Sequence, residues 1–304
     1  MQYRPLGNSG LNASVVGLGT WVLGGGSAWG PDPDDRESVR AIQASLDAGV
    51  NLIDTAPGYG WGRSEAIVGK AIQGRRDQVI LATKCGLWID DDRGSFFVAR
   101  DGKVIRRSLR PDTLAIEIER SLKFLGVDCI DLYQTHWPSV PPDFTPIADT
   151  MAALLRLKEQ GKIRALGVSN VSLAELQENL RCGGIVSDQF RYSLLHREPE
   201  RDVLPFCAQH NLATLTYMSL EQGLLTGKSG HGPRVRPGGV PQQRGVEPVV
   251  WAGEPAPRAR PARVVADAHG QIPLHAGAAG HCRHCGSAGL DPCVVRRTAG
   301  GAGP

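Results

Sequence analysis

Short apolar runs alternate with amphipathic stretches along the first three quarters of the chain. The apolar runs are nearly all hydrophobic, as in strands that are buried on both faces of a sheet. We expect seven such strands, at residues 14–21, 51–55, 78–84, 129–136, 163–170, 185–192 and 212–218. Most of the stretches between them space their apolar residues at helical intervals. They predict helices at residues 34–50, 64–74, 111–126, 147–162, 172–182 and 200–211.

Strand and helix therefore follow each other about seven times, after a segment at 3–14 whose turn residues indicate a hairpin. Such alternation predicts a parallel sheet covered by helices, because parallel neighbours need long right-handed crossovers. The sheet can be open or closed into a (β/α) barrel, and the number of repeats favours the barrel. One long polar segment, 86–110, interrupts the alternation and has no readable pattern.

The chain changes character after Lys228, where Pro, Gly, Arg, Ala and His dominate and no Lys, Asn, Phe, Tyr or Met occurs again. We therefore divide it into a barrel at 1–228 and a tail at 229–304 with no regular elements. An eighth strand–helix unit is missing, so we expect an open gap between the seventh and first strands. The tail's HCRHC, residues 281–285, lacks a matching second pair of ligands. It is a weak zinc signal, and we expect no metal.

The charge and hydrophobicity of the chain limit the kinds of partner that it can have. A formal charge of +3 over 304 residues is too weak to indicate a nucleic-acid partner. No window of 18 apolar residues predicts a membrane span, and the N-terminus does not read as a signal peptide, so we expect a cytoplasmic protein. Single cysteines at 85, 129, 182 and 207 are typical of free thiols.

Polar residues follow the second, third and fourth predicted strands: Asp54 and Tyr59, then Lys84, then His136. Each alone has a structural explanation, as a helix cap, a half-buried aromatic, a rim charge or a core histidine. In a (β/α) barrel these strand ends meet at one face, where such barrels carry out their chemistry. Together they indicate a tuned proton donor, because a lysine held charged by an aspartate lowers the pKa of a neighbouring tyrosine from its usual value near 10.

The proton would go to a carbonyl oxygen as it becomes an alkoxide, with His136 orienting that oxygen. Such a reaction needs a hydride donor across the same face. Ser169, Asn170 and Gln189 end or lie on the fifth and sixth strands, with groups able to hold a carboxamide. Tyr217 ends the seventh strand with a ring for a nicotinamide to stack on. Tryptophans 21, 29, 61, 88 and 137 lie near strand ends, which indicates an aromatic substrate pocket.

Five motifs, NLIDTAPGYGWGRSE, LATKCG, IDLYQTHWP, GKIRALGVSN and YMSLEQGLLTGK, resemble the aldo-keto reductase family, in its bacterial stress- and sugar-related and potassium-channel β-subunit branches. The resemblance covers about residues 3–228. It implies a (β/α)8 barrel and NADPH-dependent reduction of aldehydes or ketones, with Tyr59 as acid, Asp54 and Lys84 as its tuners and His136 orienting the substrate. It also implies a small-molecule carbonyl substrate. No G-x-G-x-x-G follows a strand, so a Rossmann-type site is not indicated.

The resemblance further implies residues that hold the cofactor. They are Ser169, Asn170, Gln189, Tyr217, Ser219, Leu220, Gln222 and Gly223. Met218 departs from the family, which often has a serine there near the pyrophosphate, so main-chain groups from Ser219 to Gly223 would serve instead.

One extra base near Gly230–His231 would explain the tail. In a shifted frame with chosen synonymous codons, LDPCVVRR reads LTHVLCGAR, which is similar to the family's eighth-strand segment and its site for the adenosine 2′-phosphate. A genuine extension is the other interpretation. The alternative to a reductase is a non-catalytic nucleotide-binding protein of the β-subunit kind, or an inactive frameshifted product. Nothing in the sequence favours one carbonyl substrate, NADPH over NADH, or one oligomeric state.

Overall fold

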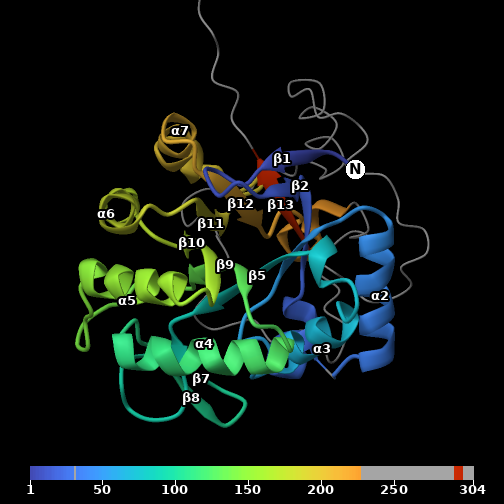
Figure 1. Cartoon of the computed structure of the whole chain (residues 1–304), viewed down its shortest axis with the longest axis horizontal. Helices are drawn as coiled ribbons and strands as arrows, with labels where there is room; N and C mark the ends of the chain where they lie inside the picture. The colour runs from blue at the N-terminus through green and yellow to red at the C-terminus, as the bar shows by residue number, and fades with distance from the viewer. Residues whose placement is uncertain (31, 227–290, 297–304) are drawn as a thin grey trace, which may run out of the picture.

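The computed structural model describes residues 1–30, 32–226 and 291–296, and its centre is a closed eight-stranded barrel (Figure 1). Seven of its strands run parallel to one another, in the order in which they occur along the chain. They are β3 (Val16–Gly19), β4 (Leu52–Asp54), β5 (Ile80–Cys85), β9 (Ile130–Thr135), β10 (Ile163–Ser169), β11 (Ser187–Arg191) and β12 (Ala213–Tyr217). All seven predicted strands are confirmed. The parallel barrel follows from their two-sided burial, since every described residue of β4, β5 and β9 is buried.

The predicted helices are also confirmed, and they surround the strands (Figure 1). They are α2 (Asp35–Asp47), α3 (Arg63–Ala71), α4 (Pro111–Leu125), α5 (Ile147–Glu159), α6 (Leu173–Gly183) and α7 (Val203–Gln209). Short turns of helix lie at η1 (Trp21–Gly24), α1 (Gly26–Trp29), η2 (Arg76–Gln78), η3 (Glu198–Glu200) and η4 (Glu221–Thr226). Pro111 opens α4, and Gly126 ends it in the left-handed region at φ 64°. Ser172 and Glu175 form a capping box at the start of α6.

Two apolar layers hold the barrel together. One lies between the strands and the helices, and the other fills the barrel's interior, with Leu52, Ala82 and Leu132 among its members. The predicted hairpin, β1 (Tyr3–Pro5) and β2 (Asn12–Ser14), is confirmed. Its fully buried Leu6 belongs to the interior layer, so the hairpin closes one end of the barrel.

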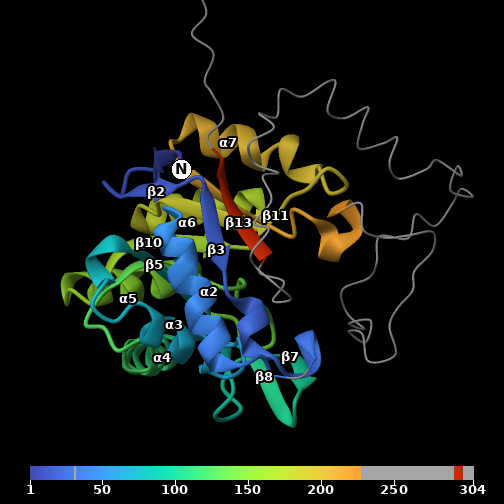
Figure 2. The ribbon, with the colours of Figure 1, turned by 90° about the vertical axis from the view of Figure 1, so that its right-hand side faces the viewer.

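The expected gap between the seventh and first barrel strands is wrong. β13 (Asp291–Arg296) lies there, hydrogen-bonded to β12 on one side and to β3 on the other (Figure 2). It runs antiparallel to both neighbours, so the eighth position has a strand but not the parallel strand of a regular (β/α)8 barrel. Unpaired edges on β3 and β12 cost free energy, which explains why the tail's backbone fills the space. The rest of the predicted tail, including HCRHC, lies outside the described residues.

Segment 86–110, which had no readable pattern, forms a three-stranded antiparallel sheet at the end of the barrel opposite the β1–β2 hairpin (Figures 1 and 2). Its strands are β6 (Leu87–Trp88), β7 (Ser95–Arg100) and β8 (Lys103–Arg107). Asp101 and Gly102 turn the chain between β7 and β8, both at positive φ. An Asp-Gly pair between two runs is a strong hairpin signal, and the sequence prediction overlooked it.

Four of the chain's seven cysteines were expected to be free thiols, and they are free: Cys85 and Cys207 are buried, and Cys129 and Cys182 are partly exposed. No helix among the described residues is long and apolar enough to cross a membrane.

Candidate active site

The end of β4, the following loop and the end of β5 bring three of the predicted residues into contact. The ammonium of Lys84 donates to Asp54 Oδ2 at 2.7 Å and to the phenolic oxygen of Tyr59 at 3.1 Å. Its third hydrogen bond goes to the Thr55 carbonyl at 3.1 Å. The side chains of Lys84 and Asp54 are only 1% and 7% exposed. The predicted acid and its two tuners therefore form one hydrogen-bonded cluster.

Two amides inside the barrel hold Asp54 in place. Its Oδ1 accepts hydrogen bonds from Gln189 Nε2 at 3.0 Å and from Gln134 Nε2 at 3.3 Å. Both oxygens of the buried carboxylate are therefore satisfied, as a buried charge requires. Gln134 was not predicted as part of the site. Its signal was its position on β9, two residues before His136, which places both side chains on the same face of the strand.

The cluster keeps Lys84 charged. Burial alone acts to lower the pKa of this lysine, but Asp54 and the Tyr59 phenol together outweigh burial and raise the pKa above its usual value. A permanent positive charge 3.1 Å from the phenolic oxygen stabilises the negative charge that this oxygen takes when its proton leaves.

A tight turn positions Tyr59. Gly60 has a φ of 65°, and a Cβ there would lie 2.4 Å from the carbonyl oxygen of Gly24. Only glycine therefore fits where this loop crosses the β3 end of the barrel. The indole of Trp21 stacks on the Tyr59 ring, with centroids 6.0 Å apart. The loop and the indole together fix the direction of the phenol.

His136 lies edge-on to Tyr59, with ring centroids 5.8 Å apart. Its main-chain N–H donates to the Cys85 carbonyl at 2.8 Å, and its own carbonyl accepts from Asn170 Nδ2 at 3.0 Å. Burial, and then the charge of Lys84, hold the pKa of His136 well below its usual value. The imidazole is therefore neutral at physiological pH and can donate one hydrogen bond without carrying charge.

The predicted nicotinamide residues also gather beside this cluster. Asn170 Nδ2 donates to Ser169 Oγ at 3.0 Å, and Tyr217 donates its hydroxyl hydrogen to Asn170 Oδ1 at 2.6 Å. Asn170 adopts a left-handed φ of 60°, which asparagine tolerates better than most residues. The result is a patch of amide and hydroxyl groups next to a half-buried aromatic ring, which fits a ring that carries a carboxamide. Gln189 lies in the same group but directs its Nε2 at Asp54.

The predicted phosphate contacts lie where η4 follows β12. Met218, Glu221, Gln222 and Gly223 all have positive φ, so the backbone coils tightly there. The main-chain N–H groups of Ser219 and Leu220 donate no hydrogen bond within the described part of the chain. Glu221 anchors the turn through Arg191 and Ser193, and its own charge faces those partners. Exposed N–H groups on such a turn fit a phosphate.

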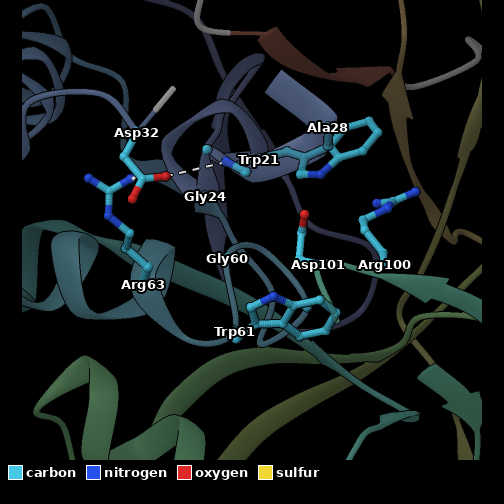
Figure 3. A pocket seen from close by; sticks show the side chains of 12 residues that line it. Trp21, Gly24, Ala28, Asp32, Gly60, Trp61, Arg63, Arg100 and Asp101 are labelled. Atoms are coloured by element: carbon cyan, nitrogen blue, oxygen red, sulfur yellow. Dashed lines mark hydrogen bonds and ion pairs between the residues drawn. The ribbon is translucent and has the colours of Figure 1, made fainter. Parts of the chain in front are cut away.

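A cavity of about 280 Å³ opens beside the Tyr59 loop (Figure 3). Figure 3 shows the side chains of Arg100 and Asp101 between the indoles of Trp21 and Trp61. Trp29 packs edge-on against Trp21 at 5.2 Å, which agrees with the predicted aromatic pocket. Trp88 is different, because it is buried away from this cavity and donates to Asp91.

Comparison with known proteins shows which family the chain resembles. The sequence model of the "Aldo/keto reductase family" matches residues 15–275. The NADH-specific methylglyoxal reductase of Escherichia coli (strain K12) is 45% identical over 228 residues, which cover 75% of this chain and 70% of that protein.

Two solved structures resemble the fold. The glycerol dehydrogenase of Gluconobacter oxydans has a TM-score of 0.67 and 39% identity, covering 76% of this chain and 68% of its own. An aldo/keto reductase from Klebsiella pneumoniae, solved in complex with NADP and acetate, has a TM-score of 0.58 and 31% identity. That match covers 71% of this chain and 68% of the Klebsiella chain. The chain therefore belongs to the aldo/keto reductase family of NAD(P)H-dependent oxidoreductases.

Proposed function

We propose that this chain reduces an aldehyde or ketone to an alcohol, with Tyr59 as the proton donor. The observation that carries the proposal is the buried Asp54–Lys84–Tyr59 cluster, joined by hydrogen bonds of 2.7 and 3.1 Å. A nicotinamide dinucleotide supplies the hydride when it is bound. Lys84 is the donor in its bond to the phenolic oxygen, so the phenol keeps its own proton for transfer. The neutral imidazole of His136 donates to the same carbonyl oxygen and orients it.

Two sets of residues would hold the dinucleotide, one at its nicotinamide and one at its phosphates. Ser169, Asn170 and Tyr217 would take the nicotinamide end, with Gln189 behind them against Asp54. Main-chain groups of Ser219, Leu220, Gln222 and Gly223 would take the phosphates. We propose NADPH as the donor, on the likeness to the Klebsiella reductase solved with NADP. The Escherichia coli relative is named NADH-specific, so both dinucleotides belong in the first titration.

The first experiment titrates the full chain with NADPH and NADH while following tryptophan fluorescence, and then adds aldehydes. Saturable binding followed by aldehyde-dependent oxidation of the dinucleotide is expected. Tyr59→Phe should lower the turnover rate by about 10²- to 10⁴-fold while it keeps dinucleotide binding. Unchanged turnover in that variant would remove Tyr59 from the mechanism. Binding without turnover in the unaltered chain would instead favour a regulatory nucleotide-binding protein.

A second preparation tests the interpretation of the tail. Deleting one base near codon 231 changes the frame of everything after it and leaves the catalytic cluster untouched. If the unaltered chain binds no dinucleotide and the reframed chain does, the tail is a frameshift product and the chain as it stands is inactive. Equal binding by both would favour a genuine extension.

A further inference from the structure

The β6–β8 sheet carries basic side chains of two kinds. Arg93 and Arg110, which flank the sheet's strands, each make an ion pair with Asp112. Arg100, Lys103 and Arg107 have no ion pair among the described residues. We term these three the unpaired cations. Arg106 also has no ion pair there, but it donates to the Gly94 carbonyl, and Asp101, next to Arg100, accepts from the Ser27 N–H.

Two of the unpaired cations, Lys103 and Arg107, lie against aromatic rings, and Arg100 lines the cavity beside the Tyr59 loop. Arg100 lines the cavity between Trp21 and Trp61 (Figure 3). The Lys103 ammonium lies 5.9 Å from the centroid of the Trp61 ring. Aromatic rings next to cations that make no ion pair suit a ligand that is both aromatic and acidic. Asp32 and Asp101 also line the cavity, so the acidic group of such a ligand would lie away from them.

Arg107 contacts two aromatic rings. Its guanidinium lies 4.5 Å from the centroid of the Phe97 ring and 4.8 Å from that of Trp137, so two aromatic rings clamp it. Its Nε is buried and has no hydrogen-bond partner among the described residues, and its terminal N–H groups donate no hydrogen bond there either. Burial lowers the pKa of this guanidinium, and the charge of Glu175 acts in the opposite direction. A clamped guanidinium whose two terminal nitrogens carry no hydrogen bond can take a planar anion on that edge through two parallel bonds.

Two contacts join Arg107 to the reacting groups. Trp137 follows His136 directly in the chain. On the other side, Arg107 pairs in register with Leu87, whose Cδ1 would lie 3.3 Å from a Cβ on Gly58, the residue before Tyr59. Arg107 therefore contacts the residue after His136 on one side and pairs on the other with a residue that lies near the Tyr59 loop.

We propose that the substrate class is an aromatic or apolar aldehyde that also carries a carboxylate, and that Arg107 binds this carboxylate. Arg100 and Lys103 add positive charge at the entrance. The proposal rests on the proposed reductase function, and it names the substrate for the same site.

The test compares 4-carboxybenzaldehyde with its methyl ester, which has nearly the same shape but no charge. The unaltered chain should prefer the acid in kcat/KM by about ten- to a hundredfold, as expected for hydrogen bonds to a charged group. Raising the salt concentration from 0.05 to 0.5 M should reduce this preference. Arg107→Gln should reduce the acid-to-ester ratio to near one, and Arg107→Lys should keep part of it.

Arg106→Gln is the matched control, because Arg106 neighbours Arg107 on the same strand but donates to the Gly94 carbonyl. Its acid-to-ester ratio should equal that of the unaltered chain. Equal reduction of acid and ester by the unaltered chain overturns the proposal and leaves the reductase function standing. If the acid-to-ester ratio falls in Arg100→Gln but not in Arg107→Gln, then Arg107 is not the residue that binds the carboxylate. A loss of dinucleotide binding in Arg107→Gln, with the ratio unchanged, also overturns it.

A binding measurement separates this proposal from the reductase function. The product-like anion 4-(hydroxymethyl)benzoate should quench tryptophan fluorescence at lower concentration than its methyl ester does, and Arg107→Gln should remove the difference. If neither aldehyde is reduced, the proposed function fails, and the two quenching curves still decide whether Arg107 binds a carboxylate. Coincident curves for acid and ester would refute it.

Discussion

Removing the charge of Lys84 gives the sharpest test of the buried cluster. Lys84→Met keeps most of the side chain's volume but leaves the Asp54 carboxylate, 7% exposed, with only two amide donors. Breaking one partner of a buried ion pair costs about 3–5 kcal/mol, because the remaining charge stays buried without compensation. Asp54→Asn should cost a similar amount, since it leaves the ammonium without its 2.7 Å partner. The double variant removes both charges and should cost well under the sum of the two single losses.

Urea unfolding at pH 7, followed by tryptophan fluorescence, measures all four free energies of unfolding. Arg197→Met is the control, because its ion pair with Glu200 is 59% and 34% exposed and should leave the unfolding midpoint unchanged. The reasoning is refuted if Lys84→Met is as stable as the unaltered chain. It is also refuted if the double variant loses the full sum, because Asp54 and Lys84 would then act independently.

Three further perturbations test the surroundings of the cluster. Burial raises the pKa of Glu65 from 4.5 to about 7, so charging it costs folding free energy and the unaltered chain should lose stability between these pH values. Glu65→Gln cannot ionise, so its free energy of unfolding should rise relative to that of the unaltered chain by up to about 3 kcal/mol across that window. Urea unfolding at pH 4.5 and 7.5 measures this, and a difference that stays constant would show the reasoning to be wrong. Gly60→Ala puts a Cβ 2.4 Å from a backbone oxygen and should cost about 1–3 kcal/mol, measured against Gly74→Ala, where φ is also positive but nothing lies within 4 Å. Trp21→Ala removes the ring that stacks on Tyr59 and should lower kcat by up to about tenfold for benzaldehyde and propanal alike; an unchanged kcat for both would show that the indole does not position the phenol.

The sequence predicted the barrel well because its strands carry two independent signals. Residues 79–82 are wholly apolar, and a helix bounded by Pro111 and Gly126 separates them from the next predicted strand. The hydrophobic pattern and the residues that bound the helices therefore led to the same prediction for every parallel strand. The β6–β8 sheet was not predicted because its strands are half-exposed and mix basic with apolar residues. Neither the strand period nor the helix period therefore dominates their sequence.

The candidate site was predictable to the extent that position along a strand fixes it. Asp54 and Lys84 lie at strand ends and His136 follows one, and parallel packing brings strand ends together. Gln134 was missed because it lies inside a strand, and its one signal, a position two residues before His136, does not reveal its partner. Its contact with Asp54 joins residues 80 positions apart, which no local pattern contains.

The reversed direction of β13 has unequal consequences around the barrel. Its residue Asp291 pairs with Gly19 at the catalytic end of β3, while Arg296 pairs with Thr214 toward the opposite end. The eighth position therefore contributes a strand's beginning to the catalytic face, where the seven parallel strands contribute their ends. Asp54, Lys84 and His136 come from β4, β5 and β9, none of which touches β13 in the sheet. Tyr217 ends β12, which does pair with β13, and the proposed phosphate groups follow directly after it. The proton-donating cluster is thus separated from the reversed strand, whereas the residues proposed to bind the dinucleotide lie next to it.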